Sequence, residues 1–214
     1  MKIRKNEIVC VLIVLAIFLS TAYVYPILPE NMASHWNIAG DADGYISKLW
    51  GAFLMPIVLA GILALFIIIP RIDPLKNNII KFIEYYDMFV IVFIIFILLL
   101  HMQIILWNIG YEISPNSVLP IGFAFLFYFL GILCENAQRN WSVGMRTPWT
   151  LSSEKVWKKT NKLAGKLLKI SAAICLFGII FQDYAVYFIL IPVIVFMIYS
   201  FVYSYLEYKK LEKN

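Results

Sequence analysis

The chain has 214 residues, of which 62% are apolar and only 14% are charged, and its formal net charge is +5. A soluble domain has roughly 45–50% apolar and about 25% charged residues, because polar groups must cover its surface. This composition excludes a soluble enzyme, a disordered tail and a disulfide scaffold. It predicts an all-α, polytopic membrane protein.

Six stretches that are nearly free of charged residues predict six transmembrane helices, since about 20 helical residues cross the hydrocarbon core. Within a single membrane domain, 1–214, we place the spans at 8–26, 49–70, 87–108, 118–135, 163–182 and 185–206. The fifth uncharged run is short, so we extend its helix back to Leu163, with Lys166 and Lys169 reaching the headgroups. A minimal turn at Asp183 is expected to join the last two spans.

The distribution of basic residues predicts that both termini are cytoplasmic. With the N-terminus inside, 17 of the 18 Lys and Arg residues lie on the inner side, as the positive-inside rule requires. Lys48 is then the one basic residue outside. The net charge therefore reflects topology in a cell membrane, and we expect no direct contact with nucleic acid.

The outer loop, 27–48, contains the first group of candidate functional residues. Segment 40–44 places two glycines around two acidic residues, which is typical of tight turns. The simplest interpretation is a structured cap with Trp36 at the membrane interface. The competing interpretation is a surface that faces a ligand or toxin outside, formed by His35, Trp36, Asn37, Gly40, Asp41 and Asp43.

Three of these residues also leave open a metal site or a membrane enzyme. His35, Asp41 and Asp43 are of the types that bind metal ions and transfer protons. A calcium-binding loop, however, needs an acidic residue at its first position and a glutamate at its last. This segment lacks the first acid, and Trp50 occupies the position of the glutamate. No spacing indicates a nucleophile paired with a base. We therefore expect no catalytic residue, no metal and no cofactor, and keep the enzyme as a minor alternative.

The inner loop and an amphipathic helix, 136–166, contain the second group. Gly144 favours a turn, Pro148 favours an extended Thr147, and either Thr150 or Ser152 is expected to cap the next helix. Arginine can bind phosphate or carboxylate through two hydrogen bonds, and tryptophan can stack on it. We interpret this segment as a structural plug or as a cytoplasmic docking site formed by Arg139, Asn140, Trp141, Gly144, Arg146, Thr147, Pro148, Trp149, Thr150 and Trp157.

The helix that follows has an apolar stripe opposite a row of lysines. The stripe contains Val156, Thr160, Leu163 and Leu167. This pattern predicts a helix on the inner leaflet, where anionic lipids would attract it by about 1 kcal/mol for each basic residue near the surface.

A small transporter or channel is a further alternative, because ionisable groups inside spans tend to be functional. His101, with Gln103 nearby, is the single candidate, and Pro56 and Pro192 interrupt the second and sixth spans. A lone histidine that stays neutral and bonds a neighbouring group is more often structural.

Two strings of residues resemble the SdpI-like family of bacterial and archaeal membrane proteins. They are the outer His35-Trp36-Asn37 with Gly40, and the inner Asn140-Trp141 with Gly144 and Arg146-Thr147-Pro148-Trp149-Thr150, followed by Trp157. The family is named for an immunity protein against a secreted killing peptide. The resemblance implies protection from a peptide toxin outside, and capture of a cytoplasmic transcriptional repressor at the membrane. Relatives often have Thr-His where this chain has Thr160-Asn161.

Overall fold

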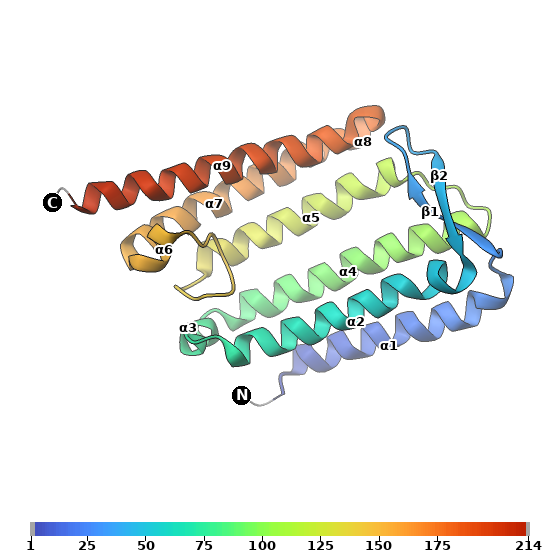
Figure 1. The fold of residues 1–214 in the computed structure, drawn as a ribbon, viewed down its shortest axis with the longest axis horizontal. Helices are drawn as coiled ribbons and strands as arrows, with labels where there is room; N and C mark the ends of the chain where they lie inside the picture. Colours follow the sequence, from blue (N-terminus) through green and yellow to red (C-terminus); the bar gives the residue numbers. More distant parts are fainter. Residues whose placement is uncertain (1–2, 213–214) are drawn as a thin grey trace.

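A computed structural model describes residues 3–212 as a bundle of long helices with one β-hairpin (Figure 1). The long helices are α1 (Lys5–Val24), α2 (Lys48–Ile72), α4 (Ile83–Asn108), α5 (Pro115–Asn136), α7 (Glu154–Cys175) and α9 (Ala185–Glu212). The shorter elements are η1 (Tyr25–Ile27), β1 (Asn31–Trp36), β2 (Ala42–Ser47), α3 (Lys76–Ile80), α6 (Pro148–Ser152), α8 (Phe177–Ile180) and η2 (Gln182–Tyr184).

Six helices in the described part of the chain are long and apolar enough to cross a membrane, which confirms the predicted fold class. Several extend beyond the predicted spans: α4 begins at Ile83 rather than at residue 87, and α5 begins at Pro115 rather than at residue 118. The Asp183 turn is the short helix η2. The inner-side lysines Lys2 and Lys213 lie outside the described residues.

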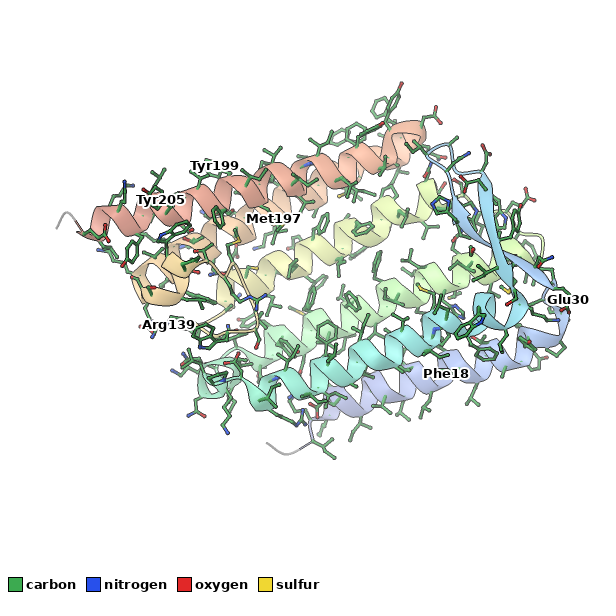
Figure 2. All side chains as sticks on the ribbon, in the orientation of Figure 1. Phe18, Glu30, Arg139, Met197, Tyr199 and Tyr205 are labelled. Carbon is green, nitrogen blue, oxygen red and sulfur yellow. The ribbon has the colours of Figure 1, made fainter. Side chains whose placement is uncertain are left out.

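The bundle has two chemically different ends (Figure 1). The hairpin β1–β2 lies at one end, which we call the hairpin end. The opposite end has α3, α6 and the loop 137–147, and α1 begins and α9 ends there. We call it the basic end. Figure 2 shows Glu30 at the hairpin end and Arg139 at the basic end.

Helix packing forms two groups that meet between α4 and α5. Buried residues of α1, α2 and α4 form most of one apolar cluster, which Leu133 of α5 and Trp157 of α7 also join, and buried residues of α5, α7 and α9 form another. The rings of Phe96 and Phe123 join the groups with their centroids 4.9 Å apart. Gly122 lies against Phe96, and an added Cβ there would approach that ring to 2.6 Å. A small residue is therefore needed at this crossing.

Two glycines let α5 and α7 approach closely. A Cβ at Gly131 would lie 2.7 Å from the carbonyl oxygen of Gly165, and a Cβ at Gly165 would lie 2.5 Å from that of Gly131. Close contact of backbones at small residues is a common source of helix association in membranes. It also places the Lys169 ammonium 2.6 Å from the Glu135 carboxylate.

The amphipathic segment and the fifth span form one continuous helix, α7. The stripe that was expected on the lipid surface lies largely against protein instead: Val156 and Thr160 are almost fully inaccessible, and Leu163 and Leu167 are half-buried. An apolar stripe opposite lysines suits a bundle helix as well as an interfacial one, which explains the wrong expectation. The predicted cap of α7 is also wrong. Ser153, rather than Thr150 or Ser152, caps this helix by accepting from the Val156 N–H.

Candidate functional site

The outer loop is an antiparallel β-hairpin fixed to the ends of α4 and α5. The side chain of Asn108 accepts from the Ala33 N–H at 2.8 Å and donates to the Ala33 carbonyl at 3.0 Å. Asn116 donates to the carbonyl of Ile38 at 2.7 Å. The Asn108 amide thus replaces a ladder partner that the edge of a two-stranded sheet lacks, and Asn116 holds the turn after β1. The expected structured cap is present, although its strands were not predicted.

The tip of the hairpin is closed by Asn37 and Asp41. The Asn37 side-chain oxygen accepts from the Asp41 N–H at 3.0 Å, and the Asn37 N–H donates to the Asp41 carbonyl at 2.9 Å. Gly40 has a positive φ of 91°, and an added Cβ there would lie 2.5 Å from the Ser114 hydroxyl oxygen. These three predicted site residues therefore shape the turn.

His35 and Asp43 form the one exposed ionisable pair of the hairpin. The His35 Nδ1 lies 2.5 Å from an Asp43 carboxylate oxygen, and their side chains are 72% and 45% exposed. Asp41 does not join them. Within residues 3–212, no group of three or more His, Cys, Asp or Glu residues could hold a metal ion. The hairpin thus brings together two of the three residues on which a metal site or an enzyme would depend.

Trp36 is an anchor of the hairpin. Its ring meets Trp107 edge to face, with the centroids 5.5 Å apart. The accessible apolar surface belongs instead to Ile38 and Tyr45, which are 58% and 63% exposed. Sequence reasoning missed these two, because only the strand pattern shows which side chains point away from the bundle. His35, Asp43, Ile38 and Tyr45 are therefore the accessible face of the hairpin.

At the basic end, the loop 137–147 is organised around two buried polar side chains. Asn140 is fully buried; its side-chain oxygen accepts from the N–H groups of Ser142 and Val143. Asp73, at the end of α2, accepts from the Trp141 N–H at 3.1 Å and from the Ser142 hydroxyl at 2.5 Å. These bonds satisfy loop backbone groups and fix the loop to the α2 end.

Gly144 and Asn161 hold the middle of the loop against α7. Gly144 has φ 106°, and its expected turn is confirmed. The Asn161 side-chain oxygen accepts from the Met145 N–H at 2.7 Å, and Asn161 is 1% exposed. Asn161, where the resemblance to the SdpI-like family leads us to expect histidine, therefore has a definite structural role.

The Thr147-Pro148-Trp149-Thr150 string forms the start of α6. The Thr147 side chain caps the helix by accepting from the Thr150 N–H. The Thr150 hydroxyl oxygen accepts from the Thr147 N–H in turn, so the two residues form a capping box. Thr147 also lies 3.0 Å from the Ser204 hydroxyl of α9. Trp149 contacts the rings of Phe201 and Tyr205. This string attaches α6 to α9.

The two arginines of the loop bind backbone carbonyls. Arg139 donates to the Leu151 carbonyl at 3.1 Å and Arg146 to the Trp141 carbonyl at 2.6 Å. Trp157 is buried, whereas Trp141 is 54% exposed. The structural-plug interpretation therefore accounts for most of the ten residues. Trp141, Arg146 and Pro148 are the members of the set that remain accessible.

A four-residue charge network at the basic end was missed. Arg71 of α2 binds both Glu7 carboxylate oxygens, at 2.6 and 2.8 Å. The Arg4 Nε lies 3.0 and 2.9 Å from the two Asp87 oxygens, and Arg4 also pairs with Glu7. Glu7 and Asp87 are 5% and 6% exposed. The network joins α1, α2 and α4, and separations of 64 and 83 residues gave no local signal of it.

Two lysines of α7 form ion pairs with neighbouring helices. Lys159 pairs with the buried Glu207 of α9 at 2.5 Å, and Lys169 pairs with Glu135 of α5. Besides Lys159, the exposed lysines along this helix are Lys155, Lys158, Lys162 and Lys166. Surface charge available to an anionic partner is thus concentrated on one side of α7.

Comparison with known proteins finds family models that match two parts of the chain. Residues 136–204 match the model of the SdpI/YfhL protein family, and residues 11–60 match a domain of unknown function, DUF1648. The immunity protein SdpI of Bacillus subtilis (strain 168) is 27% identical over 208 residues, which cover 97% of this chain and 98% of the relative. No solved structure matches.

The fold defines a multi-pass α-helical membrane protein with an ordered segment at each end of its bundle. The comparisons confirm the resemblance inferred from the two strings: part of the chain matches the SdpI/YfhL family model, and nearly all of it is similar to the immunity protein SdpI. The family model covers the basic-end loop, α6, α7 and most of α9.

Proposed function

We propose that this protein is a membrane immunity protein that protects its cell from a secreted peptide toxin. The observation that carries the proposal is the likeness to an immunity protein over nearly the whole of both chains. In this proposal both termini are cytoplasmic, because that orientation places the basic end inside. The hairpin then faces the toxin, and its accessible face offers charge and apolar surface together.

The test is survival of sensitive cells that express this chain and receive the killing peptide of the namesake system. Survival should rise with expression, and unchanged survival would contradict the immunity function. A triple variant of the accessible face, His35→Ala, Ile38→Ala and Tyr45→Ala, should lose protection at unchanged membrane abundance. The control is Leu12→Ala, an exposed residue of α1.

We also propose that the basic end docks a cytoplasmic repressor. Support comes from the accessible remainder of the loop, where Trp141 is exposed and its carbonyl accepts from the exposed Arg146, and from the exposed lysines of α7. An exposed tryptophan near positive charge is a common anchor of protein interfaces.

A tagged repressor of the namesake system should move to the membrane when both this protein and the toxin are present. Trp141→Ala should reduce the membrane-bound fraction, whereas Trp50→Ala, an equally exposed tryptophan at the hairpin end, should not. Partitioning that is independent of the toxin, or unaffected by Trp141→Ala, would contradict this role.

A further inference from the structure

A small cleft at the basic end lies between the first turns of α7 and the last turns of α9, and its volume is about 140 Å³. The described residues that line it are three lysines, one glutamate and two apolar residues: Lys155, Lys159, Lys210, Glu207, Val156 and Leu211. A cavity needs only about 10–15 Å³ to hold one water molecule. The cleft therefore has room for a small anionic group.

Glu207 positions two of the three lysines. Its side chain is 6% exposed; Lys159 binds one carboxylate oxygen at 2.5 Å and Lys210 binds the other at 2.6 Å. Both carboxylate oxygens are thus paired, and the two ammonium groups lie on either side of them. The side chains of Lys159 and Lys210 are 47% and 67% exposed, so an anion that enters the cleft can reach them.

The cleft has an excess of positive charge, because three lysines surround a single glutamate. Lys155 and Lys159 are four residues apart and lie on one face of α7, where like charges repel each other. Glu154 and Glu212, the acids next in sequence, are exposed and do not line the cleft. An anion between the lysines would remove this repulsion and use donors that one carboxylate does not need.

The cleft lies at the depth of the lipid headgroups. The uncharged run 184–206 of α9 ends directly before Glu207. Trp149 contacts Tyr205 with the ring centroids 5.0 Å apart, and such aromatic pairs mark the membrane interface. Figure 2 shows Tyr205 towards the basic end of α9. Lys210 follows Tyr205 by about 7.5 Å along the helix, and the headgroup layer on each side of the hydrocarbon core is roughly 5–7 Å thick.

We propose that this cleft binds a phosphate group, supplied by an anionic lipid of the leaflet in which the basic end lies. Lys155, Lys159 and Lys210 donate to the phosphate oxygens, and Glu207 keeps two of them in place. The lipid is then a second bridge between α7 and α9, beside the Lys159–Glu207 ion pair. This single site needs both helices, unlike the general attraction of an interfacial helix to anionic lipid. It depends neither on the immunity function nor on which leaflet the basic end faces.

Native mass spectrometry of the full-length protein, released from detergent micelles, measures the binding of individual lipids. Phosphatidylglycerol has a net negative charge, whereas the choline of phosphatidylcholine would bring a further cation to the lysines. One phosphatidylglycerol should bind saturably, and phosphatidylcholine should bind at least about tenfold more weakly. Inorganic phosphate is the third probe. If it displaces phosphatidylglycerol at equal concentration, the lipid source is overturned and the cleft is a site for soluble phosphate.

Two double variants then distinguish the cleft from net charge. Lys155→Gln with Lys210→Gln removes two lysines of the cleft and keeps Lys159 with its ion pair to α9. The matched control, Lys158→Gln with Lys209→Gln, removes the same charge from exposed positions of the same two helices outside the cleft. The first should weaken phosphatidylglycerol binding at least about tenfold and the control less than about threefold. Equal weakening by both would overturn the site.

Lys155→Arg with Lys210→Arg tests whether a loss of binding reflects lost charge or lost folding. Arginine keeps the charge and can bind phosphate through two hydrogen bonds, so phosphatidylglycerol should bind this variant within about threefold of the unmodified protein, or more tightly. Thermal unfolding gives a second readout, because a ligand that binds the folded state raises the unfolding temperature. Phosphatidylglycerol should stabilise the unmodified protein and the arginine variant more than the glutamine variant. Equal stabilisation of all three would contradict the proposal.

Discussion

The indole Nε1 of Trp157 donates a hydrogen bond of 2.7 Å to the carbonyl of Ala137, the residue that caps the C-terminus of α5. Four residues further along α7, Asn161 accepts from Met145. The first two turns of α7 therefore hold both the beginning and the middle of the basic-end loop. A loop fixed in this way has a defined surface before any partner arrives.

Trp157→Phe should destabilise the protein by about 1–3 kcal/mol, because it leaves the buried Ala137 carbonyl without its donor. Unfolding by SDS in mixed micelles would measure this change, and trypsin cleavage after Arg139 should become faster. Lys158→Ala, an exposed neighbour, is the control and should change stability by less than about 0.5 kcal/mol. Equal effects of the two substitutions would contradict the assigned role of the indole.

Gly144→Ala should lower the thermal stability more than Gly110→Ala, although both glycines have positive φ values, 106° and 99°. An alanine at either position incurs the left-handed strain of about 1–2 kcal/mol. At Gly144 the new Cβ would also lie 2.6 Å from the Asn161 side-chain oxygen, while at Gly110 no atom lies within 4 Å. Thermal unfolding of the two variants in the same detergent measures the difference. Similar losses would mean that the Asn161 contact does not constrain the loop.

The six spans could be predicted because each depends on composition within its own segment. The hairpin could not, since β1 has no clear alternation, and its strands are held by Asn108 and Asn116, which lie more than 70 residues away. The stripe of α7 was assigned to lipid because a helical pattern does not specify whether protein or membrane covers it. For the inner string, the sequence left both a structural plug and a docking site open, and the bonds of Asn140, Arg146, Thr150 and Trp157 to loop backbone groups could not be read from residue types.

The charge network predicts that removing one charge of a pair destabilises the protein more than removing both. Glu7→Gln alone leaves the partly buried Arg71 without its carboxylate and should cost roughly 3 kcal/mol, whereas the double variant Glu7→Gln with Arg71→Met should be less destabilised than that. The Glu7 side chain is 6% exposed and that of Arg71 is 24% exposed, so neither is well hydrated. SDS titration of both variants measures the coupling. If the double variant loses as much stability as the two single substitutions added together, Glu7 and Arg71 are not energetically coupled.

Topology can be tested with a single reactive cysteine, because the native thiols are buried. Tyr45→Cys at the hairpin and Lys158→Cys at the basic end both replace exposed side chains. In intact cells, a membrane-impermeant maleimide should label the first and not the second, and permeabilised cells should show both. Labelling of Lys158→Cys alone in intact cells would reverse the proposed orientation and place the hairpin in the cytoplasm.

His35→Ala distinguishes the interpretations of the hairpin. The side chain is exposed and pairs only with the exposed Asp43 among described residues, so its loss should change stability by less than about 0.5 kcal/mol. If the hairpin face meets the toxin, survival should fall severalfold while membrane abundance stays constant. Asp43→Asn keeps the shape and a hydrogen-bonding partner, so it should retain more protection than His35→Ala. A metal site or an enzyme would instead lose function equally in both variants, and metal analysis of the purified protein would show an ion that either substitution removes.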